Sequence, residues 1–403
     1  MNKVKHYLNP PALAFKQAGS FVLYSSLIGW NKSLQWLIRH GFSTLPVSAG
    51  AIGMGCIGFP NHPVWEITTA CNERCLHCHA NGGKPQKDEL NTAEGFRLIE
   101  DIAKCEEFRM LVYTGGEPLV RKDLFDLLAY SQKIGFKNVI ATNAIDIDDA
   151  MAKELKKLGV YGLAISLDHI DPEVHNHIRQ RKDAFELALR GIEACRKNGI
   201  ILQINITAME YNINKIQEIL QFADKADAAI VLNYQLVSVG RAANIEEKVI
   251  SIEKNRSLMN NLLKWQKDIT PIIEPVASPQ YWPNMLIKKG KFQDYHIKIA
   301  KNFFHGCTAG IGLAYIKPNG DIWPCPFVEV SAGNVREKPF NEIWRNSEYL
   351  QKLRNRDNLG GSCGNCRFNV LCGGCRGKAW AASGDSFAED PTCFIPDDIK
   401  LKK

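Results

Sequence analysis

Between residues 64 and 276 the chain alternates short apolar runs with longer amphipathic runs, and this alternation restricts its fold more than any other feature. The apolar runs predict six strands, at residues 64–68, 110–114, 138–142, 162–167, 201–207 and 230–236. The amphipathic runs predict helices at residues 92–104, 124–133, 149–158, 184–197 and 213–226. Strands that alternate with helices form a parallel sheet with right-handed crossovers. The sequence therefore predicts an α/β fold with its sheet covered by helices.

Composition describes an ordinary globular protein. The 403 residues include 45% hydrophobic and 23% charged residues, so two or three domains with a large core are expected. The net charge of +7 is modest, and no basic run with interleaved aromatic residues suggests a nucleic-acid partner. No continuous apolar stretch is long enough to predict a membrane span.

Thirteen cysteines are unusual for a chain of this size. In a small secreted protein they would predict disulfides, but this chain is large and shows no export signal. Most of them are closely spaced, which is typical of metal ligands. We therefore expect a reducing, cytoplasmic setting. Cys105 and Cys195 are expected to be structural, as is Cys56.

The spacing Cys71-x3-Cys75-x2-Cys78 is the strongest chemical signal. Three thiolates can hold three irons of a cubane and leave the fourth iron open, and an open metal position is where chemistry takes place. The same segment also fits haem attachment (C-x-x-C-H) or a zinc site completed by His77 and His79. Neither alternative requires the Gly-Gly-Glu-Pro element at residues 115–118, which follows a predicted strand.

Together, the cysteine triplet and Gly115-Gly116-Glu117-Pro118 resemble the radical S-adenosylmethionine (SAM) superfamily. The resemblance implies a partial (β/α)6 TIM-like barrel whose [4Fe-4S] cluster is held by Cys71, Cys75 and Cys78. It also implies that SAM chelates the fourth iron and is cleaved to methionine and a 5′-deoxyadenosyl radical. Sites in such barrels lie at the carboxyl ends of the strands, where each of these motifs is predicted to lie.

The resemblance further implies a SAM pocket formed by His77, Gly115, Gly116, Glu117, Asn143, Ser166, Asp168 and Arg179. His77 would lie near the adenine, and the glycine turn near the SAM ammonium with Glu117 offsetting its charge. Thr142-Asn143 and the Ser166/Asp168 pair would face SAM from two strand ends. Arg179, in a His175-x3-Arg179 pattern, would meet the SAM carboxylate. Gln180 stands where relatives have glycine, which leaves the conformation of this loop open.

Seven further cysteines follow in the C-terminal part, where they resemble the SPASM domain that carries auxiliary iron–sulfur clusters. The resemblance implies one [4Fe-4S] cluster on Cys363, Cys366, Cys372 and Cys393. A second would be held by Cys307, Cys325 and Cys375, with its fourth position open or filled by another side chain such as His305. Two C-x-x-C pairs are also the commonest zinc signature, so one or two auxiliary clusters are expected and zinc is the alternative.

The sequence predicts four regions. Residues 1–60 form a helical extension, 61–240 the barrel, 241–304 a bridge, and 305–403 the SPASM domain. Residues 12–42 are apolar with Trp30 and Trp36, and predict helices packed on the enzyme or an interfacial segment in contact with a membrane. Gly240-Arg241-Ala242 is expected to border the substrate cavity.

The predicted function is a radical SAM oxidoreductase or maturase that passes a substrate electron to the auxiliary clusters. Its substrate is expected to be a peptide, a protein or a tetrapyrrole. Cys372-Gly-Gly-Cys375-Arg376 and Asp390-Pro391-x-Cys393 resemble haem-pathway members in particular. A flavodoxin or ferredoxin type of protein is the expected electron donor. The alternatives are a radical SAM enzyme acting on a lipid-like substrate, a non-catalytic iron–sulfur electron carrier and a zinc-stabilised binding module.

Overall fold

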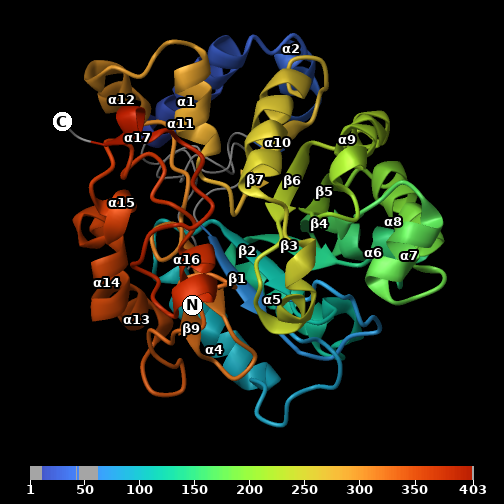
Figure 1. Cartoon of the computed structure of the whole chain (residues 1–403). Coiled ribbons are helices and arrows are strands. Elements are labelled where there is room, and N and C mark those ends of the chain that lie inside the picture. Colours follow the sequence, from blue (N-terminus) through green and yellow to red (C-terminus); the bar gives the residue numbers. More distant parts are fainter. Residues whose placement is uncertain (1–10, 42, 45–61, 402–403) are drawn as a thin grey trace.

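The computed structural model describes residues 11–41, 43–44 and 62–401, and its centre is a single nine-stranded sheet (Figure 1). The strand order is β7-β6-β5-β4-β3-β2-β1-β8-β9. Strands β1 to β7 follow one another in parallel, β8 pairs in parallel with β1, and β9 pairs antiparallel with β8. Together with the fold relatives described below, this confirms the predicted α/β partial barrel.

The strands are β1 His62–Glu66, β2 Met110–Thr114, β3 Lys137–Thr142, β4 Val160–Ser166, β5 Ile201–Ala208, β6 Ile230–Gln235, β7 Ile272–Val276, β8 Leu313–Ile316 and β9 Ile322–Trp323. The barrel helices are α4 Thr92–Ala103, α5 Leu124–Ile134, α6 Asp149–Lys157, α7 Pro172–Arg179, α8 Ala184–Lys197, α9 Ile216–Lys225 and α10 Ile252–Trp265. The later helices are α11 Tyr281–Lys288, α12 Asp294–Ala300, α13 Phe340–Asn346, α14 Glu348–Arg354, α15 Gly361–Gly364, α16 Arg376–Ser383 and α17 Asp397–Lys400. Short 3₁₀ turns occupy Pro118–Val120, Ile213–Lys215, Gly240–Lys248 and Arg356–Asn358.

The helices begin where side chains can bond the free N–H groups of the first turn. Asn91 and Glu94 form a reciprocal capping box at the start of α4, and Asp171 accepts two N–H groups at the start of α7. The apolar faces of the helices then cover the outer side of the sheet in the main core. A smaller cluster that includes Met110, Val112, Val139 and Ala164 fills the inner side.

All six predicted strands are present, and β7 was missed. The sequence interpretation placed Ile272–Val276 in the bridge because Pro275 interrupts it. Proline lacks the N–H needed inside a sheet but is tolerated in an edge strand. In the structure β7 is that edge strand, since it pairs with β6 and ends the sheet.

The C-terminal region contributes to the opposite edge of the sheet. Strands β8 and β9 form a hairpin, and β8 pairs with β1, the strand that leads into the cysteine triplet. Gly320 lies in the turn of this hairpin with φ +91°, a backbone conformation that residues other than glycine rarely adopt. The two cysteine-bearing regions are therefore joined through one sheet. The four domain boundaries drawn from the sequence stay predictions.

The N-terminal residues form α1 Pro11–Ile28, α2 Ser33–Trp36 and a π-helical turn Leu37–Gly41. Trp30 and Trp36 are buried, and their indole N–H groups donate to the carbonyl oxygens of Ile269 and Ala229 at 2.8 Å. These tryptophans therefore pack on the barrel and are not the side chains that would enter a membrane interface, so membrane contact by this segment stays a prediction. Among the described residues, no helix is both long and apolar enough to span a bilayer.

Candidate active site

The cysteine triplet lies in the loop that follows β1, at the carboxyl edge of the barrel. Cys71 and Cys75 each lie near enough to Cys78 for their charges to interact. The N–H of Glu73 donates to the Cys71 sulfur and that of Gly82 to the Cys78 sulfur, each at 3.4 Å. Hydrogen bonds of this kind stabilise and tune cluster thiolates.

Burial raises the pKa of Cys71 to about 11, so the thiol is protonated in the metal-free chain at neutral pH. A coordinating metal deprotonates such a thiol outright. Three neighbouring thiols, two of them with backbone N–H donors, are the ligand set that an iron–sulfur cluster takes.

The glycines of the Gly-Gly-Glu-Pro turn are required by close packing on this loop. A Cβ on Gly115 would lie 2.5 Å from the Thr68 carbonyl oxygen, and one on Gly116 would lie 2.2 Å from that of Ala70. The N–H groups of Gly116 and Glu117 donate to Thr68 and Ala70 at 2.7 Å. The turn thus holds the cluster loop. From the sequence, the glycines were expected to lie near the SAM ammonium.

Glu117 is buried and its carboxylate joins two strand ends. It accepts hydrogen bonds from Thr142 Oγ1 and from the N–H groups of Asn143 and Leu119. Burial raises its pKa to about 7, against the effect of these donors. Asn143 in turn donates from Nδ2 to Asn72 in the cluster loop at 2.7 Å.

Arg179 is the central cation of the predicted pocket. Its Nη2 lies 2.6 Å from Asp168 Oδ2, and its Nη1 lies 3.8 Å from both Glu73 Oε2 and the Cys75 sulfur. Burial alone would raise the pKa of Asp168, but Arg179 and nearby histidines hold it below its usual value. Gln180 adopts the left-handed conformation, with φ 56° and ψ 41°, at the end of α7, so it takes the backbone geometry that glycine favours.

His77 and His175 complete this group. His77 Nε2 lies 3.5 Å from Asp168 Oδ2, and burial lowers the pKa of His77 to about 4. His175 Nδ1 accepts the N–H of Asp168 at 3.3 Å, and burial lowers its pKa to about 3. Ser166 lies half-buried at the end of β4, opposite Asn205 of β5. The structure thus brings His77, Asp168 and Arg179 together beside the cluster loop.

Sequence analysis missed two residues that fix the cluster loop. Arg241 donates from Nε to the Cys75 carbonyl oxygen at 2.9 Å and from Nη1 to that of Gly82 at 2.8 Å. The expectation that Gly240-Arg241-Ala242 borders the substrate cavity stays a prediction. His79 was considered as a ligand of the alternative zinc site, but its Nε2 lies 3.2 Å from Tyr315 Oη in β8. Tyr315 lies near both Cys78 and Cys325, so it connects the two cysteine regions. No sequence motif marked either contact, because both join distant segments.

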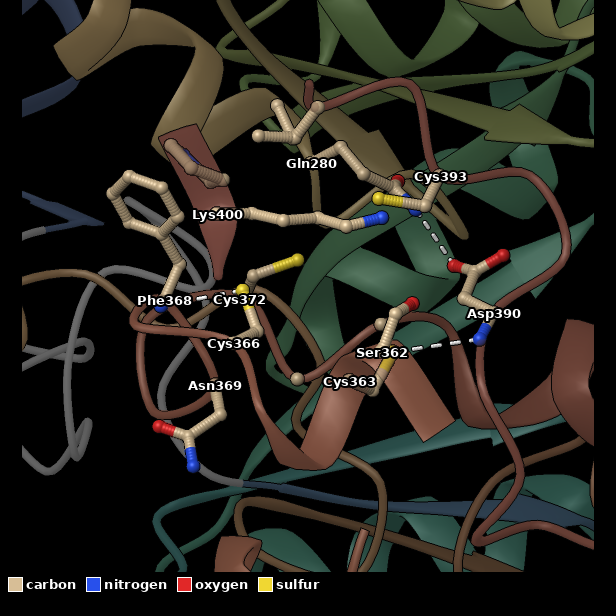
Figure 2. A pocket seen from close by; sticks show the side chains of 14 residues that line it. Gln280, Ser362, Cys363, Cys366, Phe368, Asn369, Cys372, Asp390, Cys393 and Lys400 are labelled. Atoms are coloured by element: carbon tan, nitrogen blue, oxygen red, sulfur yellow. Dashed lines mark hydrogen bonds between the residues drawn. The ribbon is translucent and has the colours of Figure 1, made fainter. Parts of the chain in front are cut away.

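Four C-terminal cysteines line one cavity of about 370 Å³, as Figure 2 shows. They are Cys363, Cys366, Cys372 and Cys393, the set predicted to share a cluster. The N–H of Phe368 donates to the Cys366 sulfur at 3.3 Å, and Arg376 Nη2 donates to the Cys363 sulfur at 3.6 Å. Lys400 also lines the cavity. The four sulfurs, the N–H donors to two of them and the nearby Lys400 fit an anionic iron–sulfur cluster.

The other three cysteines also lie together. Cys325 interacts electrostatically with Cys307 and Cys375, and Lys378 donates its N–H to the Cys375 sulfur at 3.4 Å. The side chain of Lys378 is buried and hydrogen-bonded to Gln235 at the end of β6. His305 as a fourth ligand stays a prediction. Cys105 and Cys195 are buried in the core, and Cys56 lies outside the described residues.

Asp390 contacts both cysteine sets. Its N–H donates to the Cys363 sulfur at 3.4 Å, and its Oδ2 accepts the N–H of Cys375 at 2.6 Å. Gln280 donates to the same oxygen at 2.7 Å. These bonds hold the Asp-Pro-x-Cys segment against the Cys-Gly-Gly-Cys loop.

Comparisons with known proteins agree with this geometry. Residues 65–223 match the radical SAM superfamily model, and residues 307–367 match the SPASM model, described as an iron–sulfur cluster-binding domain. The AdoMet-dependent heme synthase of Oleidesulfovibrio alaskensis is 32% identical over 82% of this chain and 86% of its own length. The mycofactocin maturase of Mycolicibacterium smegmatis is 27% identical over 82% of this chain and 81% of its own.

Among solved structures, SuiB from Streptococcus suis bound to S-adenosylmethionine superposes with a TM-score of 0.65. It is 18% identical, and the match covers 84% of this chain and 78% of SuiB. This likeness shows the fold. Because residues 65–223 match the radical SAM superfamily, SAM and a [4Fe-4S] cluster are the chain's cofactors. The SPASM match indicates that the C-terminal part binds auxiliary iron–sulfur clusters. The chain therefore belongs to the radical SAM superfamily and is a radical SAM enzyme with a C-terminal SPASM domain.

Proposed function

We propose that this radical SAM enzyme modifies a tetrapyrrole, using Cys71, Cys75 and Cys78 to hold the SAM-binding cluster. The observation that supports this site best is the loop after β1. Its three thiols lie together, each with an N–H or guanidinium donor. When bound and reduced, the cluster supplies one electron to SAM, which breaks into methionine and a 5′-deoxyadenosyl radical.

The chain's own residues would then bind and orient SAM. Gly115 and Gly116 press the second strand's turn onto the cluster loop, which fixes the position of backbone groups at the strand ends. Arg179 is held beside Cys75 by Asp168 and Glu73, so its guanidinium is set in place before SAM arrives. Such preorganisation lowers the cost of orienting a reactant. His77, Asn143 and Ser166 are the further proposed contacts.

The tetrapyrrole assignment is supported by the haem synthase relative, which is more similar than the peptide maturase. A peptide substrate is the second candidate, supported by that maturase. Cys363, Cys366, Cys372 and Cys393 would hold one auxiliary cluster, and Cys307, Cys325 and Cys375 a second. These clusters would supply an acceptor for the electron that the substrate loses. A low-potential flavodoxin or ferredoxin in a reducing cytoplasm is the proposed donor.

The test is transfer of a labelled hydrogen atom. Anaerobically reconstituted protein is incubated with SAM, dithionite and iron-coproporphyrin III deuterated on its propionate side chains. We expect 5′-deoxyadenosine that carries deuterium, measured by mass spectrometry. Cys71→Ser should abolish its formation. Cys195→Ser is the matched control, because Cys195 lies in the core and serine can keep its hydrogen bond to the Ile200 carbonyl oxygen.

The outcomes separate the parts of the proposal. If wild-type protein forms no 5′-deoxyadenosine, or Cys71→Ser still forms it, the assignment of this cysteine site is wrong. If 5′-deoxyadenosine forms without deuterium from the porphyrin, the site stands and the tetrapyrrole assignment is wrong. A precursor peptide would then be the next substrate to test.

A further inference from the structure

Large apolar side chains stand out from the surface near the four-cysteine cavity. Tyr295 and Ile299 of α12 are 57% and 52% exposed, and Val370 and Leu401 are 39% and 42% exposed. Exposed apolar residues that gather in one place mark interaction sites more often than single ones do. This group therefore calls for a partner.

The group is tied to the cavity by the chain itself. Val370 lies between Cys366 and Cys372 in the sequence, and Leu401 forms a backbone bridge with Cys366. Arg367, next to Cys366, is paired with Asp294 at the start of α12. Figure 1 shows α12 and α17 near each other at one end of the molecule. Cys366 is itself half-buried, so this is the side on which the cavity approaches solvent.

The surrounding charge is positive on balance, although α17 contributes the exposed Asp397 and Asp398, of which Asp397 is paired with Lys400. Exposed lysines precede, occupy and follow α12, at Lys288, Lys289, Lys291, Lys298 and Lys301. Asp294 is the one acidic residue between Lys288 and Lys301, and it is paired with Arg367. An apolar centre with a charged rim is the usual anatomy of a protein–protein interface. A basic rim selects an acidic partner, because complementary charge steers the encounter and disfavours partners of like charge.

We propose that this α12 surface, formed by Tyr295, Ile299, Val370 and Leu401 with the rim of lysines, docks a small acidic electron-carrier protein of the flavodoxin or ferredoxin class. The proposal rests on the auxiliary cluster that the proposed function places at the four cysteines. The docked carrier, in its oxidised form, would take from that cluster the electron that the substrate loses, whichever substrate this is. Electron-transfer partners form small, weak interfaces in which charge contributes much of the recognition. A few exposed apolar residues with a basic rim suffice for such an encounter.

The test measures binding, with purified flavodoxin as the probe and the cluster-loaded full-length enzyme as its partner. We expect the dissociation constant to rise about tenfold or more in Lys298→Glu/Lys301→Glu, because two attractive charges become repulsive. Tyr295→Ser/Ile299→Ser should weaken binding without changing net charge. Raising the salt concentration should weaken wild-type binding and have less effect on the charge-reversed variant, because salt screens exposed charges.

Lys133→Glu/Lys157→Glu is the matched control, since it changes net charge equally at exposed lysines of α5 and α6. It should bind flavodoxin as the wild type does. Iron content and dithionite-driven SAM cleavage should match the wild type in every variant, which separates failed docking from failure of the proposed function. Equal loss in the control and α12 variants would overturn the proposal. So would binding of anionic phosphatidylglycerol vesicles at this surface with no binding of flavodoxin.

Discussion

Replacing Arg179 by Met should show how much this buried cation contributes to the stability of the predicted SAM pocket. Arg179 is buried between Asp168 and Glu73, whose side chains are at most 2% exposed. Removing one member of a buried ion pair leaves an uncompensated charge and typically costs about 3–5 kcal/mol. The variant therefore loses about that much stability at neutral pH. It should also release iron faster, because Arg179 donates to the Cys75 sulfur.

The pH dependence gives the sharper test. In the wild type, Arg179 and nearby histidines hold the pKa of Asp168 below its unfolded value, so Asp168 adds stability that is lost only as the pH falls through that lowered pKa. Without Arg179, burial would raise the pKa of Asp168, and it would raise further the pKa of Glu73, which burial already holds above its usual value. The two buried carboxylates then destabilise the folded variant most at high pH, where they are charged. This destabilisation decreases as they take up protons. The gap between variant and wild type should therefore shrink from pH 7 to pH 5.

Thermal unfolding of the holoprotein under anaerobic conditions, followed by near-UV circular dichroism, measures this gap. Arg196→Met is the matched control, because Arg196 is half exposed and pairs with the exposed Glu193. Exposed pairs contribute about 0–1 kcal/mol, so this control should unfold close to the wild type. A gap for Arg179→Met that stays constant or widens at pH 5 would refute the account of buried carboxylates.

Three further predictions concern packing and titration. Gly116→Ala would place a Cβ 2.2 Å from the Ala70 carbonyl oxygen, so iron bound per chain after reconstitution should fall well below the wild-type value. Trp36→Ala removes a fully buried indole and its bond to Ala229, and should cost about 3–5 kcal/mol in thermal or denaturant unfolding. His175 has its pKa lowered to about 3 by burial, so the unfolded chain alone takes up its proton below about pH 6.5. The wild-type protein should therefore lose about 2 kcal/mol of unfolding free energy through His175 between pH 6.5 and pH 5. The His175→Gln variant should lose less over the same range.

The barrel was predictable because its signals are local. Each predicted strand is an apolar run and each helix an amphipathic run, so the sequence contains both within a few residues. Strand β7 was not predicted because it contains Pro275, and proline is tolerated mainly in edge strands such as this one. Strands β8 and β9 were not predicted because they are short and because β1, with which β8 pairs, lies some 250 residues away in the sequence.

The cysteines of the site were predictable for the same reason, since their spacing is local. The residues that hold them were not. Arg241 is matched to the carbonyl oxygens of Cys75 and Gly82 only after the sheet forms. The contact of His79 with Tyr315 likewise needs β8 beside β1. The sequence near these residues suggested other roles for them, because both contacts join segments that are distant along the chain.

These supporting contacts explain why a loop can serve as the centre of the site. Loops are usually the most mobile part of a fold, and a cluster needs its three thiols kept in one arrangement. Here the loop is held by the β2 turn through Gly116, by the β3 end through Asn143, by α7 through Arg179 and by the loop after β6 through Arg241. Three attachments come from segments that follow β2, β3 and β6 and the fourth comes from the end of α7, so closing the sheet also fixes the loop. It follows that a change at any one of these ends should act on iron retention before it acts on the barrel itself.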